Sequence, residues 1–402
     1  MLRNSLENIR VLDFTQIGAG PLATMLLADL GADVIKVEPL KGDVGRKLGP
    51  PWYNGQSPIF IAFNRGKRSL CIDLKTEDGQ SIIRELAEKV DIVVESFRPG
   101  VMDRLGLGYD SLKKTNPGLV YCSVSAYGQT GPYASHPGID GIMQAASGLM
   151  GLIGVEETEP CKVQAPVVDI FSGYVAGNAI LAQLIETGRT GRGEHLDVNL
   201  FASAIALQQS AVTAYLGEGA PPVKLGSAAP YSAPNEALQA SDGWVMVAAY
   251  LSDQWPRLCR LLGLDWMIED SRFRTSSDRV VNRAVMRDHL SAAFKSESCA
   301  TWLAKLERED IICSKVLSYP EVVNHPQLDH LNLIIQTENL NLGVFQTPGF
   351  PVNSRDCNKE PYGAPPALGQ HTKEVLRASG YADARIDKLI LGNIVMNSSP
   401  NG

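Results

Sequence analysis

Short apolar runs alternate with longer amphipathic segments over the first 125 residues of the chain. The runs are rich in β-branched residues, which predicts strands at 10–15 (RVLDFT), 33–38 (DVIKVE), 69–73, 91–95 (DIVVE) and 118–125. Apolar positions with helical spacing lie between them at 21–30, where proline occupies the first turn, and at 77–90. Strands separated by helical segments of roughly ten to fifteen residues indicate β-α-β units and a parallel sheet.

The pattern changes further along the chain. Helical spacing continues at 140–152, 169–187 and 200–216, with another strand at 194–199. Glycine, proline, alanine and serine then dominate 217–234, which predicts a linker. A strand at 244–250 (WVMVAAY) follows, and helical patterns continue to about residue 320. Since 402 residues exceed one ordinary core, we expect this segment to form a second, smaller domain. Helices at 372–379 and 386–391 close the chain after a Pro/Gly-rich stretch at 348–369.

Composition narrows the class of protein. The chain is 44% hydrophobic and 20% charged with a net charge of −7, which is typical of a soluble protein and argues against a nucleic-acid partner. We expect no membrane partner, because no stretch approaches the length of a span, and no secretion signal at the N-terminus. The seven cysteines are scattered without C-x-x-C, and the histidines form no H-x-x-x-H pair. These features predict a cytoplasmic enzyme without a metal.

Asp169 stands where an apolar helix is expected to begin. It follows Val167 and Val168 and precedes a long run of small and apolar residues that reaches Thr187. Aspartate is a preferred N-cap, and a helix start favours its ionised form. An ionised carboxylate in apolar surroundings is one form of an activated nucleophile. The alternative is that Asp169 serves only as a cap.

A dinucleotide-binding fingerprint lies near the N-terminus. Gly18, Gly20 and Ala23 satisfy G-x-G-x-x-G/A after a predicted strand, and Glu38 ends the next strand. An NAD-dependent oxidoreductase is therefore an alternative. Against it, the rest of the chain shows no compact arrangement of histidine with a carboxylate or lysine that would guide a hydride.

An ordered set of motifs over most of the chain resembles the family III CoA-transferases, which include formyl-CoA transferase and carnitine CoA-transferase and are related to α-methylacyl-CoA racemase. Each motif alone is weak, but the ordered set is specific. The matching segments are 11–14 (VLDF), 19–21 (AGP), 31–38 (GADVIKVE), 64–69 (NRGKRS), 94–100 (VESFRPG), 105–106 (LG), 138–140 (GID), 145–150 (AASGLM), 190–193 (TGRG), 368–372 (LGQHT) and 380–381 (GY).

The resemblance implies a reaction without a bound cofactor, in which CoA enters as a substrate. Asp169 matches the aspartate that attacks an acyl-CoA thioester, giving an aspartyl–acyl anhydride and then an aspartyl-CoA thioester, from which an acceptor acid takes CoA. By analogy with other members of the family, we expect succinyl-CoA or another short acyl-CoA as the donor and a small carboxylic acid as the acceptor. The remaining alternatives are a racemase, the oxidoreductase and a CoA-binding protein with an inactive site.

The resemblance also implies site residues. Asp140 matches an acidic residue that supports the active site, although it is also a candidate N-cap for the helix that follows it. The positions that match CoA contacts are Gly18, Ala19, Ile72, Asp73, Leu74, Lys75, Ser96, Phe97, Arg98 and Arg104. Basic residues suit the phosphates of CoA, and the alternative for Lys75 and Arg104 is an exposed surface charge.

The implied fold is α/β, with a Rossmann-like parallel-sheet large domain and a smaller α+β domain. We expect residues 1–217 and 330–402 to form the large domain, 218–329 to form the linker and small domain, and two chains to interlock in a homodimer.

Three positions depart from the patterns of relatives. Gly18 replaces a glutamine of formyl-CoA transferase, so formyl or oxalate specificity is not implied. That enzyme's glycine-rich loop has no counterpart at 223–236. Ile139 stands where racemases carry a histidine, and the nearest histidine is His136. Since racemisation needs two opposed proton carriers, the loss of this histidine argues against a racemase.

Overall fold

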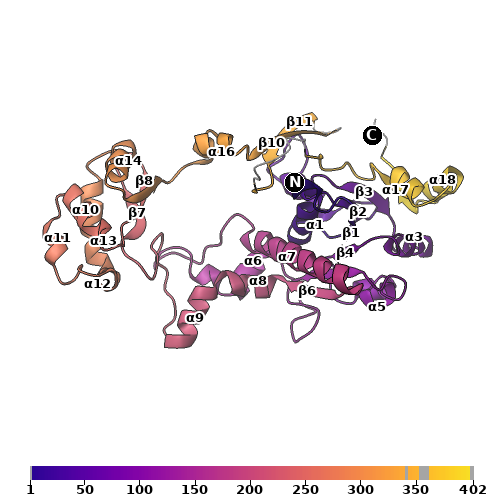
Figure 1. Cartoon of the computed structure of the whole chain (residues 1–402), viewed down its shortest axis with the longest axis horizontal. Helices are drawn as coiled ribbons and strands as arrows, with labels where there is room; N and C mark the ends of the chain where they lie inside the picture. The colour runs from indigo at the N-terminus through magenta and orange to yellow at the C-terminus, as the bar shows by residue number, and fades with distance from the viewer. Residues whose placement is uncertain (1, 340–342, 353–361, 399–402) are drawn as a thin grey trace. The chain divides into compact units, whose positions relative to one another are not determined.

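The two parts of the chain fold as separate units in the computed structural model, which describes residues 2–339, 343–352 and 362–398 (Figure 1). The larger unit runs to Leu149, resumes over Lys162–Ala220, and includes the chain from Gln327 onward. The smaller unit comprises Met150–Cys161 and Pro221–Pro326. The short segment 150–161 thus groups with the smaller unit, whereas the sequence-based boundary placed it in the large domain.

A seven-stranded sheet organises the larger unit. Its strand order is β12-β3-β2-β1-β4-β5-β6, and every neighbouring pair is parallel except β12 with β3. The order from β3 to β6 is that of doubly wound, Rossmann-type sheets. All six strands predicted for this part are present, which confirms the parallel α/β prediction. The strands are β1 (Arg10–Phe14), β2 (Asp33–Glu38), β3 (Arg68–Ile72), β4 (Ile92–Glu95), β5 (Val120–Ser125), β6 (His195–Asn199) and β12 (Val395–Met396).

Alternating apolar side chains give the sheet two buried faces. Along β1, Val11 belongs to the core shared with α1, α7 and α8, whereas Leu12 belongs to the core shared with α3, α17 and α18. This alternation follows from the two-residue period of a strand. The helices are α1 (Ala19–Asp29), α2 (Pro58–Phe63), α3 (Glu77–Ala87), α4 (Val101–Arg104), α5 (Tyr109–Leu112), α6 (Asp140–Ala146), α7 (Val167–Thr190), α8 (Leu200–Leu207), α9 (Gln209–Glu218), α17 (Thr372–Ala378) and α18 (Asp383–Leu391).

Helix α7 packs closely along α1. Gly173 permits the approach, because a Cβ there would lie 2.8 Å from the carbonyl oxygen of Ala19. Ala176 and Gly177 are buried on the same side of α7. By length and composition alone this helix could cross a membrane, so the expectation that no stretch reaches such a length was wrong for α7. In the fold, its buried side is a packing surface of the larger unit.

The smaller unit has its own antiparallel sheet and its own core around Trp255, Phe273 and Phe294. The buried Arg279 donates hydrogen bonds to the carbonyl oxygens of Ala233, Phe273 and Tyr250. The strands are β7 (Asn235–Gln239), β8 (Trp244–Ala248) and β9 (Ile312–Lys315), and the helices are α10 (Gln254–Leu261), α11 (Trp266–Glu269), α12 (Ser276–Val281), α13 (Arg283–Phe294), α14 (Cys299–Arg308) and α15 (Tyr319–Val323). Helix α16 (Pro326–His330) and the antiparallel pair β10 (Ile334–Asn339) and β11 (Gly343–Pro348) follow.

Candidate active site

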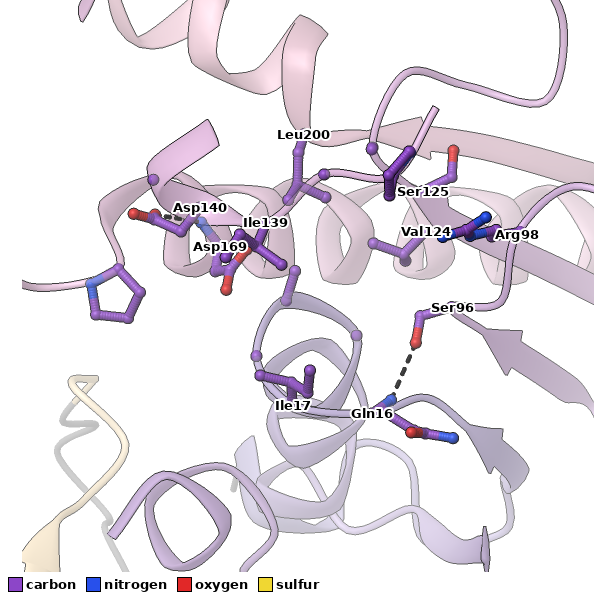
Figure 2. A pocket seen from close by; sticks show the side chains of 18 of the residues that line it. Gln16, Ile17, Ser96, Arg98, Val124, Ser125, Ile139, Asp140, Asp169 and Leu200 are labelled. Carbon is purple, nitrogen blue, oxygen red and sulfur yellow. Dashed lines mark hydrogen bonds between the residues drawn. The ribbon is translucent and has the colours of Figure 1, made fainter. Parts of the chain in front are cut away.

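A cavity of about 580 Å³ opens at the carboxyl ends of β1, β4 and β5. Chain order reverses between β1 and β4, and in open parallel sheets this switch point is where ligands bind. The volume is within the range of small-molecule sites. The loop after β1, the turn after β4 and the start of α7 all contribute to the lining (Figure 2). Asp169, Asp140, Gly18, Ala19, Ser96, Phe97 and Arg98, all predicted from the sequence, line this one cavity.

Asp169 lies in the first turn of α7 and not at its cap. The helix begins at Val167 with Pro166 as N-cap, so the prediction that Asp169 caps the helix was wrong. Its side chain is partly buried and accepts no hydrogen bond from any residue that the structure describes. A carboxylate of this kind remains available to a ligand in the cavity.

Asp140 supplies the cap that Asp169 does not. Its Oδ2 accepts the backbone N–H groups of Val168 at 2.8 Å and Asp169 at 3.3 Å, and its Oδ1 accepts from Nε2 of Gln144. Asp140 is the first residue of α6, whose N-cap is Ile139, so the alternative that it caps its own helix was wrong. One acid therefore fixes the start of α7 from a neighbouring helix and leaves the other free.

Burial and charge act together on Asp169. Loss of water around the carboxyl group and the nearby Asp140 raise the pKa of Asp169 from 3.8 to about 7. The sequence-based expectation was the opposite, an ionised form favoured by the helix start. The helix dipole does favour the anion, but desolvation and a like charge outweigh it.

Gly18 touches the carboxylate of Asp169. A Cβ at position 18 would lie 2.4 Å from Oδ2 and 3.0 Å from Cγ of Asp169. A side chain here, such as the glutamine of formyl-CoA transferase, therefore requires another orientation of the aspartate. Position 18, where this chain departs from formyl-CoA transferase, therefore lies against the candidate nucleophile.

Gly18→Ala should turn the carboxylate away while the fold survives. We expect kcat to fall about tenfold, since small displacements of a reacting group carry large kinetic costs, with little change in melting temperature. Gly151→Ala is the matched control, because a Cβ there has no atom within 4 Å. Steady-state kinetics of the two variants test this, and equal activities would contradict the contact.

The loop before Gly18 is held in a strained conformation. Ile17 has a φ of 69°, an unfavourable value for a β-branched residue. Its N–H donates to Oδ1 of the buried Asp43 at 3.2 Å, and the N–H of Gln16 donates to Oγ of Ser96 at 3.0 Å (Figure 2). Strain of this kind persists only where the surroundings determine the backbone.

Buried charges lie beneath this loop. Nζ of Lys36 contacts Oδ2 of Asp43 at 2.8 Å and donates to the carbonyl oxygen of Thr15. Lys67 pairs with Asp13 at 2.9 Å. Burial alone would raise the pKa of Asp13, but Lys67 and Lys36 outweigh it and lower that pKa to about 2. Sequence reasoning missed this network, because its members are distant in the chain and meet only at the strand ends.

Two positions of the dinucleotide fingerprint, Gly20 and Glu38, make contacts within the protein. Glu38 is buried and accepts two hydrogen bonds of 2.7 Å from Arg46 and one from Ser69, so it is not placed to bind a ribose. Gly20 is needed because a Cβ there would lie 2.4 Å from Thr15. These contacts remove the residue basis for the oxidoreductase alternative.

The remaining predicted CoA contacts lie outside the cavity lining. Ile72 is fully buried in the core, so its side chain cannot touch a ligand. Asp73, Leu74 and Lys75 follow β3 at the same carboxyl edge of the sheet as the cavity, and Lys75 and Arg104 are exposed. The predicted residues therefore fall into two groups. Gly18, Ala19 and the turn 96–98 line the cavity, whereas 73–75 lie at the same edge of the sheet outside it.

Two further residues bear on the racemase alternative. The exposed Ile139 carries no proton donor beside Asp140. His136 lines the cavity, but its ring packs against Tyr133 with centroids 4.9 Å apart. The position directly before Asp140 therefore lacks the histidine that the resemblance assigns to racemases, which argues against that alternative.

Comparisons with known proteins define the class. Residues 6–372 match the model of CoA-transferase family III, and the chain belongs to this family. It is a CoA-transferase.

Two named transferases and one solved structure are similar to this chain over most of its length. Succinyl-CoA:glutarate CoA-transferase of Mus musculus is 36% identical over 392 residues, covering 97% of this chain and 90% of that protein. Acetyl-CoA:oxalate CoA-transferase of Acetobacter aceti is 35% identical over 364 residues, covering 89% of this chain and 92% of that protein. A crystal structure of a CAIB/BAIF family protein from Brucella suis has a TM-score of 0.82 at 34% identity, covering 93% of this chain and 98% of that chain.

Proposed function

We propose that the protein transfers CoA from succinyl-CoA to a small dicarboxylic acid, with Asp169 as the nucleophile. The substrate classes follow the names of similar transferases that act on succinyl-CoA, glutarate and oxalate. The observation that carries the proposal is the free carboxylate of Asp169 in the cavity at the switch point of the sheet. Asp140 is occupied by the backbone of α7 and is not free for the same role.

The first half of the reaction loads CoA onto Asp169. A carboxylate oxygen attacks the thioester carbonyl, the C–S bond breaks, and CoA leaves as a thiolate from an aspartyl–acyl anhydride. The thiolate then attacks Cγ of Asp169 and expels the donor acid as a carboxylate. An aspartyl-CoA thioester remains, and the charge and atoms balance without a proton transfer.

The second half reverses these steps with a new acid. The acceptor carboxylate attacks Cγ of Asp169 and displaces the CoA thiolate, which forms a second anhydride. The thiolate attacks the acceptor's acyl carbon, giving the new acyl-CoA and the free Asp169 carboxylate. Every intermediate is an activated acyl group, so the free energy changes little in each step.

The activity should depend on the ionisation of Asp169. Only the anion attacks a thioester, so kcat/KM for succinyl-CoA should fall about tenfold per pH unit below its midpoint and level off above it. Because burial and Asp140 raise the pKa of Asp169 to about 7, we expect the midpoint near pH 7. Asp140→Asn removes the like charge and should move the midpoint to lower pH. A wild-type midpoint below pH 5 would contradict the electrostatic account.

We also propose a homodimer. Large apolar side chains are exposed along the helices that follow the site, which are surfaces that a second copy of the chain can cover. The residues are Tyr174 and Ile185 on α7, Leu207 on α8, and Tyr215 and Leu216 on α9. Light scattering should give twice the mass of one chain, and a monomer at micromolar concentration would contradict this.

A CoA-exchange assay tests the function. The protein is incubated with succinyl-CoA and a panel of mono- and dicarboxylic acids, and the acyl-CoA products are separated by chromatography. We expect a new acyl-CoA and one equivalent of succinate for each turnover. Hydrolysis alone, or no new thioester with any acid, would contradict the proposal.

A further inference from the structure

Lys162 is a cation on the wall of the active-site cavity. Its side chain is exposed and lines the cavity together with Asp169 and Gly141. An ideal Cβ on Gly141 would lie 3.6 Å from both Cδ and Nζ of Lys162, so the lysine lies directly across this glycine. Within the part of the chain that the structure describes, Lys162 forms no ion pair with a carboxylate.

The backbone next to Lys162 is fixed by the same residues that fix Asp169. The buried side-chain amide of Gln144 pairs with both backbone groups of Val163, accepting its N–H at 2.9 Å and donating to its carbonyl oxygen at 3.1 Å. Gln144 also donates to Oδ1 of Asp140, whose other oxygen holds the start of α7. Hydrogen bonds from Val163 through Gln144 and Asp140 to the start of α7 thus fix the position of the segment next to Lys162 relative to Asp169.

Arg98 is a second cation in the lining of the cavity. Arg98 lines the cavity from the turn after β4, and Figure 2 shows Arg98 and Asp140 on opposite sides of Asp169. Lys162 lies with Gly141, the residue after Asp140. Arg98 and Lys162 are therefore two cations in the lining of the cavity that holds Asp169, and they come from different segments of the chain.

Two cations in the lining of one cavity match the charges of one class of thioester. In a dicarboxylyl-CoA, the phosphates of CoA and the free carboxylate of the acyl chain lie on opposite sides of the reacting carbonyl. The turn that contains Arg98 matches a CoA contact. Lys162 is then left to bind the acyl group. A monocarboxylic acyl chain would leave this ammonium without a carboxylate partner.

We propose that Lys162 binds the distal carboxylate of a short dicarboxylyl group and so selects dicarboxylic over monocarboxylic acids. This inference rests on the proposed function, because it assigns the acyl end of the same site. A charge-assisted hydrogen bond forms between the ammonium and the carboxylate in both the donor and the acceptor complexes. Lys162 is a specificity residue, since it does not contact the reacting carbon.

The experiment compares two acceptors of equal chain length with one donor. Succinyl-CoA is supplied with glutarate or with valerate, and the measured quantity is the ratio of the two kcat/KM values. Effects on the donor half-reaction cancel in this ratio. If valerate turnover is below detection, its inhibition constant against glutarate replaces its kcat/KM in the comparison.

We expect the wild type to prefer glutarate and Lys162→Met to lower the preference roughly tenfold. Lys162→Arg should restore most of the preference, because it keeps the charge. The control is Lys114→Met, an exposed lysine outside the cavity lining, which should leave the ratio unchanged.

An unchanged ratio in Lys162→Met would overturn the inference, whether both rates fall together or neither does. A wild type without preference for glutarate would overturn it too. Both results leave the transferase itself intact. A wild type that transfers CoA to no acid of the panel would instead contradict the proposed function, so the two failures are distinguishable.

Discussion

Asp169→Asn should abolish transfer, with kcat at least about 10³-fold lower, because the amide cannot form the acyl intermediates. The substitution is nearly isosteric, and the side chain accepts no hydrogen bond from a described residue, so the fold should survive. Binding of CoA should change little. The measurement is steady-state kinetics on protein kept cold, since deamidation would regenerate the aspartate.

Asp169→Asn should also change how the stability of the protein depends on pH. Because the folded-state pKa of Asp169 is raised from 3.8 to about 7, the wild type loses stability as pH rises through this window. Asp169→Asn does not titrate, so its melting temperature should exceed that of the wild type by a margin that grows from pH 4 to pH 7. Asp288→Asn, an exposed control on α13, should change neither activity nor this margin. Undiminished turnover in Asp169→Asn would refute the nucleophile.

Asp140→Ala should lower kcat about a hundredfold, because it releases the start of α7 and lets Asp169 move. The N–H groups of Val168 and Asp169 would lose their acceptor, at a cost of about 1–3 kcal/mol in folding free energy. Kinetics and thermal unfolding measure the two effects separately.

The conservative variant separates hydrogen bonding from charge. Asp140→Asn keeps an oxygen for the backbone of α7 but turns an amide nitrogen toward Nε2 of Gln144, so it should recover only part of the lost kcat. If Asp140→Ala stays within a few-fold of the wild type, the capping role is refuted. If the asparagine variant is as slow as the alanine variant at pH 8, one acceptor oxygen facing α7 is not sufficient to position Asp169.

The sheet could be predicted from the sequence because its strands are short apolar runs whose order along the chain is simple. Runs such as DVIKVE and DIVVE carry a period-two pattern that burial on both faces preserves. The pair β10 and β11 went unnoticed, because segments such as Gly343–Pro348 are polar and exposed on one side. The small-domain boundary at 150–161 also depends on contacts that no local pattern encodes.

Several residues that line the cavity could be predicted from the sequence, but their geometry could not. The motifs located Asp169, Asp140 and the turn Ser96–Arg98, yet they gave Asp169 the wrong role in its helix and the wrong direction of pKa shift. Both errors arise from tertiary contacts, since no local pattern encodes the burial of the Asp169 carboxyl group or the approach of Asp140 from another helix. Lys162 was missed because its segment has no periodicity, and the pairing of Gln144 with Val163 that holds this segment is a tertiary contact.

During turnover, Asp169 should carry first the acyl group of the donor and then CoA. The most direct measurement incubates the protein with succinyl-CoA, traps with hydroxylamine and maps the modified peptide by mass spectrometry. The account predicts a hydroxamate on Asp169 that requires succinyl-CoA and is absent in Asp169→Asn. A transferase that turns over under these conditions yet carries its hydroxamate on another residue, or none at all, would contradict the account.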